Sequence, residues 1–168
     1  MSKVWYGSVS NRIEEGKNYT GREIRPGDDI TMYLWSDREC YYVESVENQK
    51  RISVRRYYHC ADHSKPGGMG HQDWMLFKTW DEWNNYLADY FPEHHTKGDH
   101  RDEPPAETWV FRYGKWMREV INHEMPCPEY CTERERKAFE KDGFYRSYYN
   151  LSGKVSFGIA DYYHDWEF

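Results

Sequence analysis

Long hydrophobic runs are absent from this sequence. No stretch of the 168 residues approaches the roughly 20 apolar residues that a membrane-spanning helix needs. The opening MSKVWYGSVSNR also has no hydrophobic segment of the kind found in signal peptides. We therefore predict a protein that neither enters a membrane nor is exported, and that stays in the cytoplasm.

Positive charge is in deficit. The chain has 23 Lys and Arg against 29 Asp and Glu, which gives a formal net charge of −6. A protein that binds duplex DNA nonspecifically needs a basic footprint, so direct duplex binding is not expected. The acidic balance is compatible with contact to a basic partner surface, such as the nucleic-acid channel of a nuclease.

Catalytic signatures are missing as well. The sequence contains no G-x-S-x-G and no H-E-x-x-H, and the glycines of Lys65-Pro-Gly-Gly-Met-Gly70 are not followed by the Lys and Ser or Thr of a phosphate-binding loop. The sequence therefore favours a non-enzymatic protein. The alternative is a small enzyme that hydrolyses nucleotides or nucleic acids, which would need carboxylates or histidines converging in a pocket.

Cysteine is scarce, and without an export signal the four cysteines are predicted to be thiols or metal ligands rather than disulfides. The best set for a structural zinc is Cys60, His63, Cys127 and Cys131, because zinc accepts such Cys and His ligands in a tetrahedral site. We interpret these residues as buried thiols and surface histidines, with the structural zinc as the alternative. A second group lies in one polar stretch that we interpret as a solvated loop, with a transition-metal site as the alternative: His94, His95, Asp99, His100 and Asp102. No cofactor is predicted.

Aromatic residues are abundant by contrast. They form 18% of a chain whose hydrophobic content is only 38%, and they include 16 Tyr and eight Trp. The core must therefore rely on aromatic rings more than on Leu and Ile. Because Tyr and Trp have a polar group that can stay in water, the surplus rings suggest either a half-exposed aromatic core or a surface that binds a partner.

The region Gly27–Cys60 predicts an antiparallel meander. Three runs rich in β-branched and aromatic residues, 29–35, 39–46 and 51–59, are separated by short polar breaks. In the third run, Arg51, Ser53, Arg55 and Tyr57 share one side, which we interpret as a solvated face with a ligand platform as the alternative. Later signals predict a helix over Trp80–Tyr90 with Thr79 as its N-cap, a hairpin around Gly114, a short helix over 132–142 and a last strand over 154–160.

The fold class predicted from these elements is α+β. We expect one domain over residues 1–168, with a bent antiparallel sheet, one or two helices, and a polar loop insertion at about 92–107. A small SH3-like barrel is one form that such a sheet could take.

Two polar turns suggest where a ligand or partner would bind. Ser10-Asn11-Arg12 and Ser36-Asp37-Arg38 each place an Arg beside short hydrogen-bonding residues, and Arg binds phosphate or carboxylate in a forked geometry. The alternative is that these residues only form turns. With nearby rings, the predicted binding set is Asn11, Arg12, Trp35, Ser36, Asp37, Arg38 and Tyr57.

Three blocks resemble a group of small, uncharacterised proteins of phages, prophages and mobile elements of Firmicutes. The blocks are YGSVSNRIEE at 6–15, TMYLWSDRECYYV at 31–43 and VSFGIADYYHDWEF at 155–168. That group has no established activity, so no functional residue follows from the likeness. It implies a bacterial host cell and an accessory protein that inhibits a host defence system, either by occluding a nuclease effector, as anti-CRISPR proteins do, or by sequestering a nucleotide signal. A virion or assembly component, which would self-associate into a homo-oligomer, is a further alternative.

Overall fold

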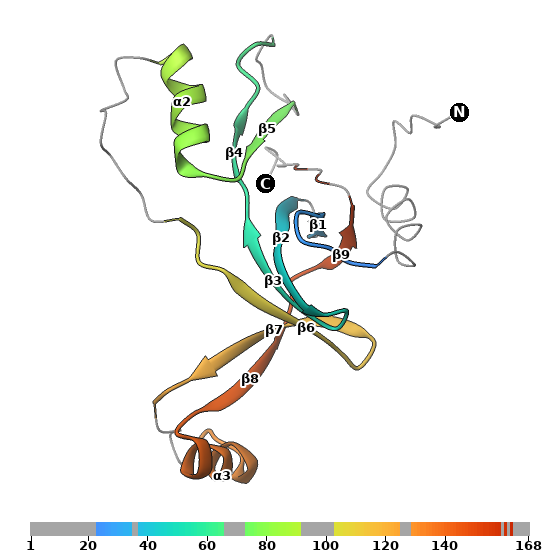
Figure 1. Cartoon of the computed structure of the whole chain (residues 1–168), viewed down its shortest axis with the longest axis vertical. Helices are drawn as coiled ribbons and strands as arrows, with labels where there is room; N and C mark the ends of the chain where they lie inside the picture. The colour runs from blue at the N-terminus through green and yellow to red at the C-terminus, as the bar shows by residue number, and fades with distance from the viewer. Residues whose placement is uncertain are drawn as a thin grey trace.

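A computed structural model describes residues 23–34, 37–65, 73–91, 103–124, 129–158, 160 and 162. Within these residues an antiparallel sheet of seven strands runs in the order β8-β7-β6-β3-β2-β1-β9, and a second sheet pairs β4 with β5 (Figure 1). The large sheet consists of β1 (Asp29–Tyr33), β2 (Arg38–Asn48), β3 (Arg51–Arg56), β6 (Glu107–Arg112), β7 (Lys115–Asn122), β8 (Tyr145–Asn150) and β9 (Lys154–Phe157). The remaining elements are β4 (Tyr58–Ala61), β5 (Trp74–Phe77), α2 (Trp80–Tyr90) and α3 (Glu133–Asp142).

The large sheet bends around a core on one of its faces, and on β1 and β2 the opposite face is buried too, at Thr31, Tyr33 and Cys40. Its core consists of alternate residues on the central strands, as the two-residue period of a strand requires: Ile30, Met32, Tyr41, Val43, Ile52, Val54 and Trp109. At the two margins of this core, the rings of Trp116 on β7 and Phe157 on β9 approach to 5.4 Å between centroids. The predicted α+β class with a bent antiparallel sheet is confirmed. In the described part β8 and β9 end the strand order without pairing with each other, so the hydrogen-bonded ladder is open.

The meander is confirmed for its first two strands, but the extent predicted for the third strand is wrong. The chain leaves the large sheet after Arg56, and Tyr58–Ala61 pairs instead with β5. Two hydrogen bonds from Tyr57 fix the point where the chain leaves the large sheet. Its N–H donates to the carbonyl of Cys40 at 3.0 Å, and its hydroxyl donates to Asp29 Oδ1 at 2.5 Å. Because residues 51–59 form one continuous run typical of strands, the sequence gives no sign that the chain passes from the large sheet to the small one within this run.

Both predicted helices begin and end through local contacts. Thr79 and Thr132 each accept a hydrogen bond from the backbone N–H three residues on, and Glu82 and Glu135 bond back to the N-cap N–H groups. Gly143 ends α3 in the left-handed conformation at φ 72°. In the part of the chain covered by the structure, no helix is long and apolar enough to span a bilayer.

A tight link joins β8 to β9. A Cβ at Gly153 would collide with the backbone carbonyl of Tyr33, so only glycine lets the link approach β1 this closely. The last predicted strand is present but ends at Phe157, which is earlier than expected. The strands β5 and β8 were not predicted from the sequence.

Candidate binding surface

The predicted binding set falls partly outside the described residues, which exclude Asn11, Arg12, Trp35 and Ser36. Its described members do not form an exposed rim. Arg38 is only 4% exposed and Tyr57 only 7% exposed, while Asp37 is half-buried and its carbonyl accepts a hydrogen bond from the N–H of Leu34. Arg38 and Tyr57 thus lie in the interior of the sheet.

The residues considered as alternative zinc ligands are also separated. Cys60 lies on β4 and His63 directly follows that strand, whereas Cys131 immediately precedes α3 at the opposite end of the long axis (Figure 1). Cys127 and the His-rich stretch 94–102 lie outside the described residues. Among the residues that are described, no three His, Cys, Asp or Glu side chains form a group suited to a metal ion. Burial raises the pKa of the Cys60 thiol to about 11, with a smaller contribution from Asp62 in the same direction, so this thiol is protonated at neutral pH.

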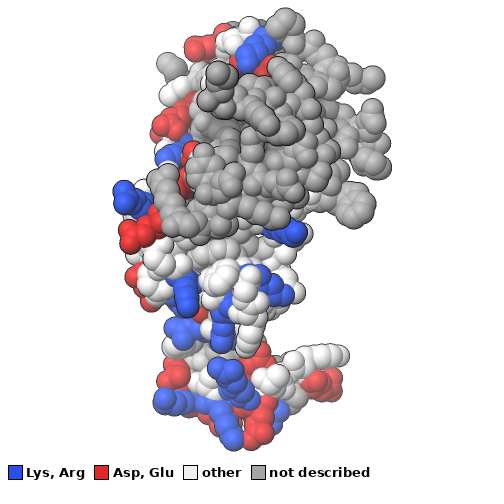
Figure 2. All heavy atoms as spheres, turned by 90° about the vertical axis from the view of Figure 1, so that its right-hand side faces the viewer, with Lys and Arg blue, Asp and Glu red and all other residues white. Residues whose placement is uncertain are grey.

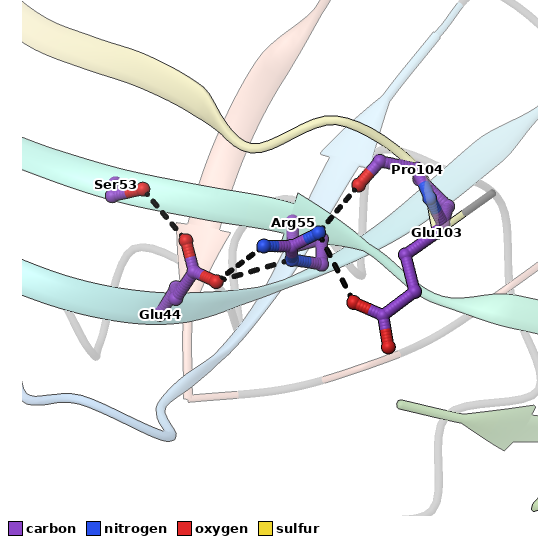
Figure 3. A network of polar contacts seen from close by, with 5 residues as sticks. All are labelled: Glu44, Ser53, Arg55, Glu103 and Pro104. Atoms are coloured by element: carbon purple, nitrogen blue, oxygen red, sulfur yellow. Dashed lines mark hydrogen bonds and ion pairs between the residues drawn. The ribbon is translucent and has the colours of Figure 1, made fainter. Parts of the chain in front are cut away.

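The basic side of β3 is neutralised by acidic partners. Arg55 donates from Nε and Nη2 to the same oxygen of Glu44, at 3.2 and 2.6 Å, and from Nη1 to Glu103 and to the carbonyl of Pro104 (Figure 3). The hydrogen bonds from Arg55 hold the pKa of Glu44 below its ordinary value, although burial opposes the shift. These contacts fasten the described end of the polar insertion to the sheet and leave Arg55 little capacity for a ligand.

Arg51 is similarly occupied. It reaches the exposed Glu47 at 2.6 Å, and it contacts Glu119, whose side chain is fully buried, through both carboxylate oxygens at 2.6 and 3.0 Å. The shorter Glu119 contact is an ion pair without hydrogen-bond alignment. Arg146 lies 3.5 Å from the same carboxylate, and burial together with a hydrogen bond to Glu119 raises the pKa of Tyr148. The buried carboxylate of Glu119 thus contacts the guanidinium groups of Arg51 and Arg146 and the hydroxyl of Tyr148.

Two cations at the turn between β6 and β7 are placed differently. Within the described chain Arg112 and Lys115 have no acidic partner, and the guanidinium of Arg112 lies 4.1 Å from the ring centroid of Tyr148. Arg112 on β6 and Lys115 on β7 are cross-strand partners, so their side chains lie on the same face of the sheet. Among the described residues, this pair therefore differs from Arg51 and Arg55, which carboxylates already hold.

The turn between them is strained and carries an exposed ring. Tyr113 and Gly114 have φ values of 52° and 76°, the pattern of a type I′ turn. Such turns favour Asn, Asp or Gly at the position that Tyr113 occupies, since a side chain with a Cβ disfavours the left-handed region. Tyr113 is nevertheless there and is 86% exposed. A costly conformation that displays an aromatic ring to solvent is a reason to look for function at this turn.

The neighbouring turn enlarges this surface. The carbonyl of Lys50, between β2 and β3, accepts a hydrogen bond from the N–H of Phe111 at 2.8 Å, which places the exposed Lys50 beside the β6–β7 turn. Both turns lie at mid-height on the right of Figure 1, and Figure 2 faces that side, with Lys and Arg gathered at mid-height above the mixed charges of α3. We name this region the hairpin-tip surface, comprising Lys50, Arg112, Tyr113 and Lys115.

The other aromatic concentration packs mainly against itself. The rings of Trp80 and Trp83 on α2 lie 4.6 Å apart, and Tyr58 of β4 contacts both. His59 stacks on Tyr162 with centroids 3.9 Å apart, so the ring of Tyr162 packs on β4. We therefore assign these rings to folding rather than to binding.

Sequence reasoning found the hairpin around Gly114 but missed its tip as a site. The signal was present, because Arg112-Tyr-Gly-Lys115 places a ring and two cations where a turn usually has Asn-Gly. Comparison with protein families, with curated proteins and with solved structures finds no match to this chain.

Proposed function

We propose that this protein is a binding protein that engages an anionic partner through the hairpin-tip surface. The observation that carries the proposal is Tyr113, an 86% exposed ring at positive φ, flanked by two cations that lack acidic partners in the described chain. Exposed rings and Arg are the residue types that most often dominate binding energy at interfaces. Such a cluster is unusual on a chain whose net charge is −6.

This proposal replaces the acidic surface expected from the net charge, but it keeps the expectation that Arg binds a phosphate or carboxylate. An acidic surface would occlude a basic groove, whereas the hairpin-tip surface is basic and suits a phosphate or a carboxylate. The resemblance to phage and prophage proteins is the support for an accessory role against host defence. Within that role, the charge of this surface favours a phosphate-bearing target over occlusion of a basic nuclease channel.

The test is binding of labelled anionic probes, measured by fluorescence anisotropy. The probes are a dT 12-mer, a 12-residue sugar-phosphate strand without bases, and a 12-residue Glu peptide. We expect at least one probe to bind, and Arg112→Ala with Lys115→Ala to weaken that binding about tenfold or more. If Lys50, Arg112 and Lys115 each meet one phosphate, the logarithm of affinity should fall with the logarithm of salt concentration with a slope of about −2.

The matched control removes the same charges elsewhere. Arg134→Ala with Lys141→Ala deletes one Arg and one Lys from the exposed surface of α3 and should leave affinity within about twofold of wild type. Equal losses in both double variants would show only a dependence on net charge and would refute the proposed surface. Failure of all three probes to bind would refute the proposed function.

A further inference from the structure

Resting on the proposed function, we infer that the anionic partner of the hairpin-tip surface is a single-stranded nucleic acid. Its phosphates meet Lys50, Arg112 and Lys115, and a base stacks on Tyr113. The inference depends on the combination of exposed ring faces with available cations, because neither feature alone distinguishes a nucleic acid from an acidic protein.

The rings supply the first part of the argument. Tyr113 exposes 86% of its surface, whereas Phe111 is 37% exposed and its ring packs edge-on against Trp116 with the centroids 5.5 Å apart. Unpaired bases stack on an exposed ring such as Tyr113 regardless of sequence, since every base has a π-face. A carboxylate-rich peptide has no aromatic ring to stack on Tyr113.

The arrangement of the cations supplies the second part. Arg112 lies over the ring of Tyr148 and also 5.7 Å from the centroid of Tyr113, so its planar guanidinium is held among rings rather than beside carboxylates. Guanidinium groups bind phosphate oxygens in pairs and themselves stack on planar groups. Lys115 is exposed on the adjacent strand and Lys50 on the adjacent turn, so a backbone passing Tyr113 would meet positive charge on both sides.

The small extent of the surface argues against a duplex. A duplex partner needs a broad basic footprint, and its bases are stacked within the helix where Tyr113 could not reach their faces. Three cations around an exposed ring suit a few unpaired nucleotides. A left-handed Tyr113 at φ 52° that is 86% exposed fits the same use, because its side chain is accessible for stacking.

The test compares the dT 12-mer with the base-free strand of the same charge. We expect the dT strand to bind roughly 5- to 100-fold more tightly, because stacking on one ring contributes on that scale. Tyr113→Asn, which suits the same turn, should remove most of this difference without changing affinity for the base-free strand. Tyr113→Phe keeps the ring and should retain the difference.

The outcomes separate this inference from the proposed function. Equal affinity for the dT strand, the base-free strand and the Glu peptide, with no effect of Tyr113→Asn, would overturn the nucleic-acid inference and leave an anion-binding surface. Binding of the Glu peptide alone would identify an acidic protein partner and overturn it too. A duplex 12-mer that binds as tightly as the single strand would also overturn it. If no probe binds, the proposed function itself fails.

Discussion

At the scale of single residues, arginines of the same sheet differ in what surrounds them. Arg55 is held by Glu44 and Glu103, Arg38 is buried, and Arg112 lies over a ring near an exposed turn. Nothing in the residue type separates these cases. Availability to a ligand depends on whether carboxylates from other strands reach the guanidinium, because a satisfied ion pair must be broken before a new one can form.

Tyr113→Asn should stabilise the protein while weakening its binding. Relief of the left-handed strain contributes about 1 kcal/mol, which exceeds the roughly 0.5 kcal/mol of the exposed contact with Arg112 that is lost. Urea unfolding should therefore show a net gain of about 0.5 kcal/mol, and Tyr113→Phe should show no change. A loss of stability in Tyr113→Asn would mean that the ring has a structural role.

At the scale of elements, Glu119 joins three strands. From β7 it contacts Arg51 on β3 and Arg146 on β8, while its own side chain is fully buried. The β6–β7 turn of the hairpin-tip surface begins β7, and α3 packs on β8, so this carboxylate helps to hold together the strands that carry both. A buried anion at such a junction is costly to remove because its partners lose their counter-charge.

Glu119→Gln should therefore destabilise the fold far more than the same change at Glu47. We expect a loss of about 1–3 kcal/mol for Glu119→Gln, reduced from that of a fully buried pair because Arg51 and Arg146 are partly exposed. Glu47→Gln removes an exposed partner of the same Arg51 and should cost less than about 1 kcal/mol. Urea unfolding of both variants tests this, and equal losses would contradict it.

For the whole molecule, the buried tyrosines couple stability to alkaline pH. Burial first, and then hydrogen bonds to Asp29 and Glu39 respectively, raise the pKa of Tyr57 and of Tyr41 well above the ordinary value. The folded protein keeps both phenols neutral after the unfolded chain begins to ionise near pH 10. Their contribution to stability is therefore complete below about pH 10 and is lost as pH rises above it.

Tyr57→Phe should flatten this alkaline loss. Between about pH 10 and 11.5 we expect the unfolding free energy of the variant to fall less steeply than that of wild type, by up to about 1.4 kcal/mol per pH unit. Tyr113→Phe is the control, because Tyr113 is 86% exposed and its removal should leave the slope unchanged. Identical slopes for Tyr57→Phe and wild type, in urea unfolding across this range, would contradict the assignment.

The sequence by itself determined what depends on neighbours along the chain. Thr79 and Thr132 with their partner glutamates start the helices, and Gly114 marks the hairpin, because caps and turns are made within a few residues. Runs rich in β-branched and aromatic residues between polar breaks also identified β1 and β2. Only the tertiary structure decided where the chain changes sheets at Tyr57, that Arg55 and Arg51 are neutralised, and that Lys50 lies beside Tyr113's turn. Those outcomes depend on carboxylates and carbonyls that belong to strands distant in the sequence, such as Glu119 beside Arg51. Neighbouring residues in the chain do not indicate which distant groups will come into contact.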